Sequence, residues 1–228
     1  MKHFGISAVS LVFAALLLLS GCASSRKDIS YNPGWGESNK LAKPVKGVVI
    51  PLEDMREYAR TYPKQVIIQT DYSGNVSSDI NDRAVDELVE DALKGELERI
   101  GVKVIPVKGV NGPLDKETAD SIKKRITAEY PGAQVAFGAR IKDFTATSKR
   151  TLIAHNVHVV GWMEFYVLDM GTGDLVWSDF KTEWEDTVAS SDHNYMIGQL
   201  EQALKNLMEK SVRENTPMRD LLSKITNR

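Results

Sequence analysis

Cysteine is the scarcest residue of this 228-residue sequence, which contains only Cys22. One cysteine cannot form an intramolecular disulfide, so the disulfide framework that small exported proteins use is excluded. Histidine is also rare, with four copies, and long runs of Lys or Arg do not occur. The 29 basic and 31 acidic residues nearly balance, so the chain lacks the basic excess that nucleic-acid phosphates require. We therefore expect no nucleic-acid partner.

The only long apolar run lies at the N-terminus, where Phe4 to Leu19 follow the basic start Met1-Lys2-His3. As a helix this run would span about 24 Å, which is less than the ~30 Å hydrocarbon core of a bilayer. A basic start, an apolar stretch and small residues before a cleavage site are typical of a secretory signal peptide. We expect residues 1–21 to be removed rather than retained as a membrane span.

The apolar run ends in Leu19-Ser20-Gly21-Cys22. These four residues resemble the lipobox of bacterial lipoproteins, and the resemblance implies cleavage between Gly21 and Cys22 and acylation of Cys22. The alternative is an ordinary cleavage site that happens to contain a cysteine. Because one acyl chain anchors only marginally, two or more make the attachment permanent. Ala23 and Ser24 stand where inner-membrane lipoproteins usually carry Asp, so the resemblance implies an outer-membrane address facing the periplasm.

Residues 22–44 are predicted to be a lipidated N-terminus and flexible tether, because Ser, Lys, Asn, Gly and Pro dominate and apolar periodicity is missing. Fully extended, this stretch reaches at most about 75 Å, so the folded part could hang clear of the membrane. Tyr31 and Trp35 are unusual for a linker. They either contact a partner or the membrane interface, or fold back onto the domain.

Residues 45–228 are predicted to form a single periplasmic α+β domain. Its first half alternates strands and helices, with strands over 45–52 and 102–107 and helices over about 79–100 and 115–130. Ser77 or Ser78 is expected to cap the first helix, and Gly101 to end it at a positive φ. Residues 66–70 form a short predicted strand in a long loop; the role of the 55–76 loop is left open.

The period then changes from 3.6 to 2, which predicts an antiparallel meander of strands over 133–147, 154–168 and 175–188. A helix follows from Asp192 to Val212, and Pro217 precedes a short amphipathic tail. The order β-α-β-α-β-β-β-α predicts a two-layer mixed β-sheet with helices on one face.

Four stretches carry a resemblance to a known family: residues 48–54 (VVIPLED), 97–104 (LERIGVKV), 139–144 (ARIKDF) and 168–178 (LDMGTGDLVWS). They are similar to segments of the YajG-type lipoproteins. The same element order occurs in the penicillin-binding-protein activator LpoB, the curli secretion lipoprotein CsgG and the N-terminal domain of TolB. The resemblance implies this fold and an outer-membrane lipoprotein, and it favours no single partner.

The candidate catalytic and metal-binding residues do not have the spacing that such sites require. His155 and His158 point to opposite faces of a strand, so no metal site is expected. Residues 190–193 (Ser-Ser-Asp-His) contain the residue types of a hydrolase triad, but neighbours in one loop do not usually align; Ser191 or Asp192 is instead expected to cap the following helix. Residues 171–173 (Gly-Thr-Gly) read as a hairpin turn, not a phosphate loop. We expect no enzyme activity and no cofactor.

The hairpin centred on Gly171 and Thr172 predicts which residues of the last two strands share a face, because paired residue numbers then sum to 343. One face is expected in the helix-covered core and contains Val157, Val159, Met163, Phe165, Val167, Val176, Phe180 and Trp184. The opposite face is mixed and carries three amphipathic aromatics of the kind enriched in interfaces. Trp162, Tyr166 and Trp177 are therefore the candidate interaction surface, the alternative being that they only shield the sheet.

The leading hypothesis is a non-enzymatic, outer-membrane-anchored lipoprotein that binds or supports another cell-envelope component. The second is an oligomeric envelope assembly or transport accessory subunit that associates with itself. An envelope hydrolase is the third, and it lacks an identifiable nucleophile and base.

Overall fold

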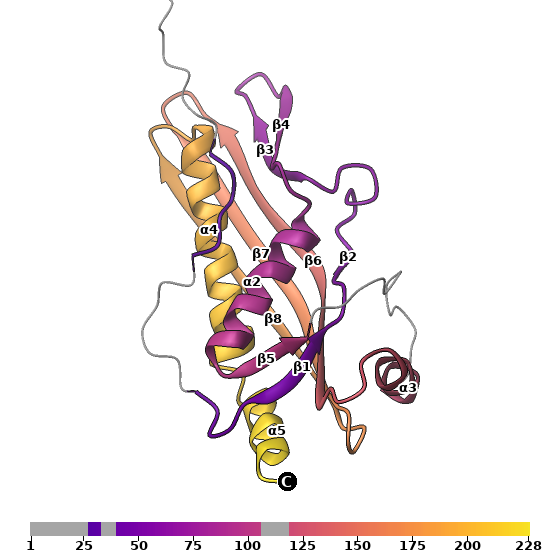
Figure 1. Ribbon diagram of the computed structural model, residues 1–228. Helices are drawn as coiled ribbons and strands as arrows, with labels where there is room; N and C mark the ends of the chain where they lie inside the picture. The colour runs from indigo at the N-terminus through magenta and orange to yellow at the C-terminus, as the bar shows by residue number, and fades with distance from the viewer. Residues whose placement is uncertain (1–26, 33–39, 106–118) are drawn as a thin grey trace, which may run out of the picture.

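The computed structural model describes residues 27–32, 40–105 and 119–228 (Figure 1). Residues 1–21, Cys22 and Trp35 lie outside these ranges. The described chain forms an eight-stranded mixed sheet with helices packed against it, which confirms the expected α+β class.

Three long antiparallel strands form one side of the sheet: β6 (Val135–Arg150), β7 (His155–Asp169) and β8 (Leu175–Val188). In the β7–β8 ladder His155 pairs with Val188 and Tyr166 with Trp177. The predicted meander and its register are therefore confirmed. Alternation of apolar and polar residues fixes this register, because a slip of one residue would turn each core side chain towards solvent.

The other edge of β6 pairs with three shorter strands one after another. β1, β2 and β3 all run parallel to β6, β5 pairs parallel with β1, and β4 pairs antiparallel with β3. Their bounds are β1 (Val45–Val49), β2 (Glu53–Asp54), β3 (Gln65–Thr70), β4 (Val76–Ile80) and β5 (Val102–Ile105). Because β6 is long enough to pair with all three strands, it connects the two ends of the sheet.

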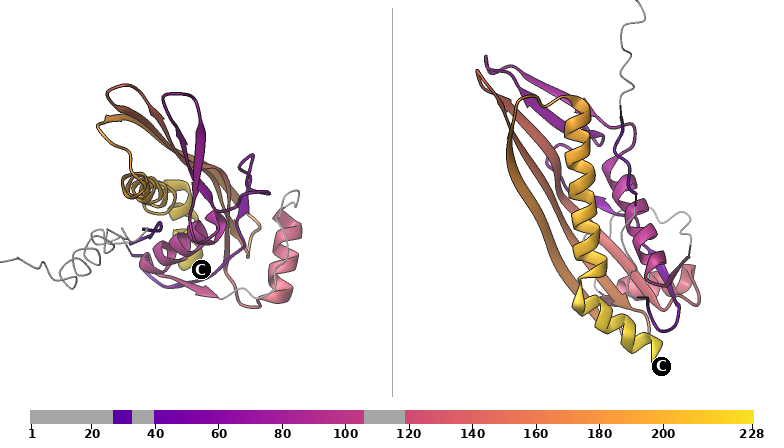
Figure 2. Two further views of the ribbon diagram at one scale, coloured as in Figure 1. Left: turned by 90° about the horizontal axis from the view of Figure 1, so that it is seen from above. Right: turned by 90° about the vertical axis from the view of Figure 1, so that its left-hand side faces the viewer.

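One face of the sheet is covered by α2 (Val85–Arg99), α4 (His193–Met208) and α5 (Thr216–Thr226), with a π-helix (Glu209–Arg213) between the last two (Figure 2). These helices bury the predicted core face of β7, including Met163 and Phe165, neither of which is accessible to solvent. Val176, Phe180 and Trp184 of β8 pack at the margin of the same core. The predicted core face is confirmed.

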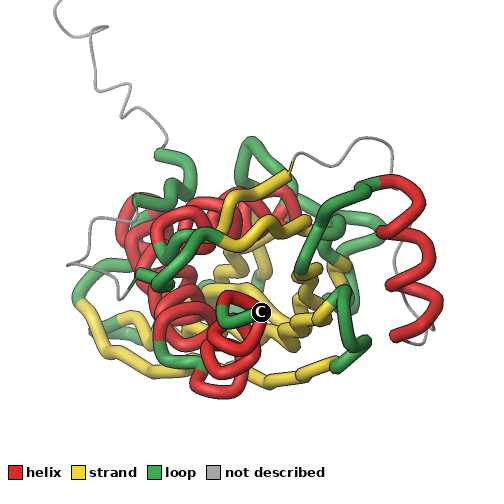
Figure 3. Tube along the Cα trace, turned by 60° about the horizontal axis from the view of Figure 1, so that its bottom comes forward, coloured by secondary structure: helices red, strands yellow, loops and turns green. Residues whose placement is uncertain are grey.

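Helix α3 (Ala119–Glu129) differs from the expectation that all helices share one face. Its Ile122 and Ile126 pack with Val48, Ala136 and other residues in a second apolar cluster, separate from the core under α2 and α4. Seen from the end that carries α5, α3 lies across the sheet from the other helices (Figure 3). Apolar side chains point to both faces at this end of the sheet, so both faces need cover.

The start of α2 corrects a second expectation, since Ser77 and Ser78 do not cap it. Both serines lie in β4, which forms a hairpin with β3, and the N-cap residue of α2 is Ala84. Asp71 closes this hairpin by accepting hydrogen bonds from the amides of Ser73 and Asn75 at 2.8 and 2.9 Å. The 55–76 loop therefore contains β3 and the turn that leads into β4.

Two predicted helix boundaries are confirmed. Gly101 has a φ of +101° directly after the C-cap of α2, a conformation that favours glycine. Asp192 caps α4, because its carboxylate accepts a hydrogen bond from the Tyr195 amide at 2.8 Å.

Residues 27–32, which we call the strap, run between α2 and α4 although composition assigns them to a tether (Figure 1). The side chain of Ile29 is buried, and its amide donates to Asn81 Oδ1 at 2.9 Å. Tyr31 donates its hydroxyl to Glu96 Oε1 at 2.6 Å. Tyr31 therefore folds back onto the domain, and burial followed by the contact with Glu96 raises its pKa well above the usual range.

Candidate interaction surface

The face of the meander opposite α2 and α4, called here the outward face, carries a row of three paired residues. Gly138 of β6 lies opposite Tyr166 of β7, and Tyr166 lies opposite Trp177 of β8. The two ring centroids are 4.7 Å apart. A Cβ on Gly138 would come within 2.2 Å of the Tyr166 ring, so glycine is what lets that ring lie flat on the sheet. A glycine inside a strand marks such close approaches.

Tyr166 is not part of an exposed surface, which corrects its place in the candidate interaction surface. It is 5% exposed and belongs to the apolar cluster that contains Ile122 and Ile126 of α3. The expectation failed because it assumed that no helix covers this face. Trp177 keeps a 45% exposed side chain beyond the edge of that cluster.

Trp162 lies further along β7 and is half-buried. Its indole Nε1 donates to Asp179 Oδ1 on β8 at 2.5 Å, and Lys181 Nζ is 5.7 Å from the ring centroid. The Arg140 guanidinium lies 5.2 Å from the centroid of Trp177 in the same way. Both tryptophans thus present an apolar ring beside a cation, a pairing that stabilises each in place.

A shallow hollow of about 400 Å³ lies on the outward face and is lined by Arg140, Glu164, Trp177, Ser178 and Asp179. Arg140 forms ion pairs with Glu53 at 3.2 Å and Glu164 at 3.8 Å. The charges in the hollow are thus mutually compensated. Aromatic side chains beside arginine and a polar rim are the composition of protein interfaces.

Lys142 and Glu183 extend the charged part of the outward face on either side of the hollow. Lys142 pairs with Glu164 at 3.2 Å. Lys181 and His158 both donate hydrogen bonds to Glu183, and these hold the pKa of its carboxyl below the usual range. Sequence reasoning missed the Arg140–Glu164 pair because charge partners on different strands become visible only once the register is known.

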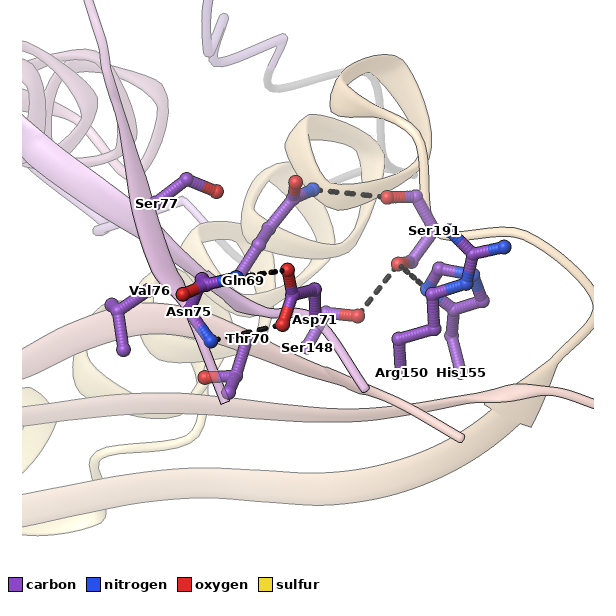
Figure 4. Close-up of a pocket in the computed structure, with 10 residues that line it drawn as sticks. All are labelled: Gln69, Thr70, Asp71, Asn75, Val76, Ser77, Ser148, Arg150, His155 and Ser191. Carbon is purple, nitrogen blue, oxygen red and sulfur yellow. Dashed lines mark hydrogen bonds between the residues drawn. The ribbon is translucent and has the colours of Figure 1, made fainter. Parts of the chain in front are cut away.

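A second, smaller pocket lies at the end of the sheet where β3, β6, β7 and the start of α4 meet (Figure 4). Ser191 Oγ is 2.6 Å from Ser148 Oγ and 2.7 Å from His155 Nδ1. Both serines are buried. Gln69 Nε2 donates to the Ser191 carbonyl at 3.0 Å, so this network ties the loop before α4 to the sheet.

The four residues of the loop motif 190–193 take separate structural roles. Asp192 caps α4, and the ring nitrogens of His193 contact Asp79 Oδ2 at 3.1 Å and the Lys27 carbonyl at 2.9 Å. Ser191 pairs with His155 instead of His193, and Asp71, which lines the same pocket, binds its own turn. A buried serine without an aligned carboxylate–histidine pair does not have the geometry of a triad.

Within the described ranges, no group of three or more His, Cys, Asp or Glu side chains is placed to hold a metal ion. The predicted separation of the two strand histidines is confirmed, since His155 contacts Ser191 on the core side and His158 contacts Glu183 on the outward face. No helix of the described chain is long and apolar enough to cross a bilayer.

Comparison with known proteins gives structural matches only. No family model and no curated protein matches the sequence. A Xanthomonas campestris protein described as DUF330 resembles 86% of this chain and 95% of its own, with a TM-score of 0.50 and 11% identity. Lipoprotein GNA1162 from Neisseria meningitidis matches over 74% of this chain and all of its own (100%), with a TM-score of 0.38 and 12% identity. The PelC dodecamer protein from Paraburkholderia phytofirmans matches over 76% and 94%, with a TM-score of 0.38 and 13% identity. At these identities the likeness concerns the fold alone.

Proposed function

We propose that this chain is a non-enzymatic lipoprotein that is anchored in the outer membrane through acylated Cys22, faces the periplasm and binds another cell-envelope component. The observation that carries the proposal is Cys22 itself, the only cysteine, placed directly after Leu19-Ser20-Gly21 at the end of the apolar run. Without a second cysteine this thiol cannot form an intramolecular disulfide, and acylation is the use that the lipobox resemblance gives it.

The outward face supports the binding part of the proposal. Trp177 lines a hollow in which Arg140 and Glu164 are paired and Asp179 accepts a hydrogen bond from Trp162. Desolvating paired charges costs less than desolvating isolated ones, and tryptophan supplies large contact area, so this face suits a protein partner with its own aromatic and polar groups.

Replacement of Cys22 tests the anchor. We expect Cys22→Ala to give an uncleaved or soluble periplasmic protein, because the thiol that accepts the lipid is gone. Membrane fractionation measures this. A Cys22→Ala protein that matures and sediments with the outer membrane would contradict the proposal.

Crosslinking in intact cells followed by mass spectrometry tests the surface. We expect Trp162→Ala and Trp177→Ala to weaken a crosslink to the partner, whereas Lys224→Ala, an exposed change on α5, leaves it unchanged. The tryptophan variants should also lose less stability than Phe165→Ala, a core truncation that costs about 3–5 kcal/mol. A Trp162 variant that unfolds as severely as the Phe165 variant would remove the basis for a binding role.

Self-association is the second candidate, and the exposed Trp177 on the outward face supports it. Among the described strands, β8 pairs only with β7 and so forms an edge of the sheet. Its outward residues include Asp179, Lys181, Glu183 and Glu185, and such charges oppose simple edge-to-edge strand pairing. A second copy would therefore contact the tryptophan-bearing face. Analytical ultracentrifugation of the parent and the Trp177→Ala variant distinguishes this from a different partner.

A further inference from the structure

Two hairpin turns at one end of the sheet hold apolar side chains in water. Leu152 and Ile153, in the β6–β7 turn, are each 93% exposed, and Tyr72, in the β3–β4 turn, is 70% exposed. Thr70 of β3 pairs with Lys149 of β6, and each hairpin turn begins within three residues of this pair. The two turns therefore start at nearly the same height along the sheet. They lie together at the end of the molecule opposite α5 (Figure 1).

The β6–β7 turn has unusual residue types at its central positions. The Thr151 amide donates to the Ala154 carbonyl at 2.7 Å and the Ala154 amide to Thr151 Oγ1 at 3.1 Å. This closes a tight turn with Leu152 and Ile153 at its two central positions. Turns are usually built from Gly, Pro, Asn, Asp and Ser, whereas Leu152 and Ile153 are aliphatic and have negative φ. Two large aliphatic side chains stabilise neither the turn nor the core here, and a departure from local rules of this kind points to function.

The charged residues that precede the β6–β7 turn in the sequence are basic. Lys149 and Arg150 precede it and both are exposed. Between Asp143 and Glu164 the sequence contains no acidic residue. A basic and apolar β6–β7 turn suits a bilayer surface that bears anionic headgroups over hydrocarbon, because lysine and arginine attract the headgroups while the aliphatic side chains enter below them. The acidic Asp71 of the β3–β4 turn is bound by the amides of its own turn.

The strap places Lys27, its first residue, at this same end. The Lys27 carbonyl is 2.9 Å from Nε2 of His193, the first residue of α4. His193 follows Val188, which pairs with His155 at the start of β7. Four residues lie between Cys22 and Lys27, and the five Cα-to-Cα steps reach at most about 18 Å. A lipid on Cys22 therefore holds the turns close to the bilayer.

We propose that Leu152 and Ile153, with Tyr72 beside them, insert into the interface of the bilayer in which Cys22 is anchored. The inference rests on the lipid anchor of the proposed function. Lipid is the occupant because the anchor lies within a short reach and because the apolar groups sit on protruding turns, whereas protein hot spots sit in packed pockets. The domain then stands on the membrane with α5 pointing away.

A fluorescent probe tests the insertion in the full acylated chain. Because acylation occupies the Cys22 thiol, Ile153→Cys introduces the single free thiol, to which an environment-sensitive fluorophore is attached. Ser223→Cys, an exposed position on α5 at the other end, is the matched control. Both proteins are reconstituted into vesicles of phosphatidylethanolamine and phosphatidylglycerol with or without brominated acyl chains, and their sedimentation with the vesicles is recorded.

We expect roughly twofold quenching at position 153 by brominated lipid and almost none at position 223, because interfacial apolar groups lie about 5–10 Å into the headgroup region. An unquenched probe at 153 in a chain that sediments with the vesicles overturns the insertion and leaves the anchor intact. A chain that carries no acyl group and does not sediment overturns both proposals. A probe shielded only in native outer-membrane fragments, or only at high protein density, would assign the turn to a protein partner or to a second copy.

Discussion

Gly138 decides whether the aromatic row on the outward face can form, because its missing side chain is the space that the Tyr166 ring occupies. We expect Gly138→Ala to lower the free energy of unfolding by about 1–3 kcal/mol, since the ring, fixed between β6 and Trp177, must shift. Chemical denaturation measures the change.

Gly198 provides the matched control, since a Cβ built there in α4 meets nothing within 4 Å. Gly198→Ala should raise stability by up to about 1 kcal/mol, because alanine loses less entropy than glycine when a helix forms. Equal effects of the two substitutions would show that Tyr166 moves aside freely.

Asp169 predicts a pH dependence of stability. Burial raises its pKa, but hydrogen bonds from Arg228 and from the amides of Gly171 and Thr172 outweigh burial and hold the pKa below the usual range. A carboxyl with a depressed folded-state pKa contributes stability above its unfolded value of about 3.9, and loses it as the pH falls through the folded value.

The acid limb of unfolding curves from about pH 5 to pH 2 checks this contribution. We expect Asp169→Asn to flatten that limb relative to the parent. Asp174→Asn, an exposed change at the other end of the same turn, is the control and should leave it unchanged. A parent-like slope in the Asp169 variant would assign the acid sensitivity to other carboxylates.

At the scale of elements, the strap behaves as part of the core although no helix or strand contains it. Ile29 is 5% exposed and packs in the main apolar cluster, and Glu201 accepts hydrogen bonds from the amide and hydroxyl of Ser30 at 3.0 and 2.7 Å. Ile29→Ala should therefore cost about 2–5 kcal/mol, as core truncations do.

Asn32→Ala, an exposed change in the same segment, is expected to stay within about 0.5 kcal/mol of the parent. Thermal unfolding of the two variants gives the comparison. If Ile29→Ala is as neutral as Asn32→Ala, the strap detaches without consequence for the fold.

At the scale of the whole molecule, the meander and the helices α2 and α4 were predictable from sequence, because their apolar residues recur at regular intervals. Strict alternation around the Gly171-Thr172 turn set the β7–β8 register, and apolar spacings of three and four marked α2 and α4. The β3–β4 hairpin gave no such signal, since β4 is mostly exposed and its serines read as helix caps.

The remaining errors concern which surfaces meet. The apolar stripe of α3 shows that it packs somewhere, but not on which face of the sheet, so the burial of Tyr166 was not foreseeable. The strap has a polar composition with a single buried aliphatic residue, Ile29, and long-range hydrogen bonds hold it. Trp162 and Trp177 lie on the predicted face, because the strand register alone determines the face of the sheet on which a residue lies.

With the proposed lipid anchor on Cys22, the strap also limits how far the domain can move from the membrane. When the strap is docked, five Cα-to-Cα steps connect Cys22 to Lys27. When the strap is released, the connection extends to Leu41, whose amide donates to the Ile100 carbonyl at 2.8 Å near the other end of α2. The reach then grows from about 18 Å to about 65 Å. In the proposed anchored form, we therefore expect strap docking to fix which end of the domain faces the bilayer.

Energy transfer from a donor on Ser223→Cys to acceptor lipids measures this orientation in the acylated chain. The parent holds α5 far from the membrane, so transfer is weak. The Ile29→Asp change combined with Glu201→Ala expels the strap, because a buried charge without a partner is too costly to retain. The longer connection between Cys22 and the domain then lets the domain reorient at the membrane. We expect energy transfer from the donor on α5 to the acceptor lipids to increase. Asn32→Asp, which adds the same charge at an exposed position, should match the parent. If the released variant remains folded by near-ultraviolet circular dichroism yet transfers as weakly as the parent, contacts other than the strap orient the domain.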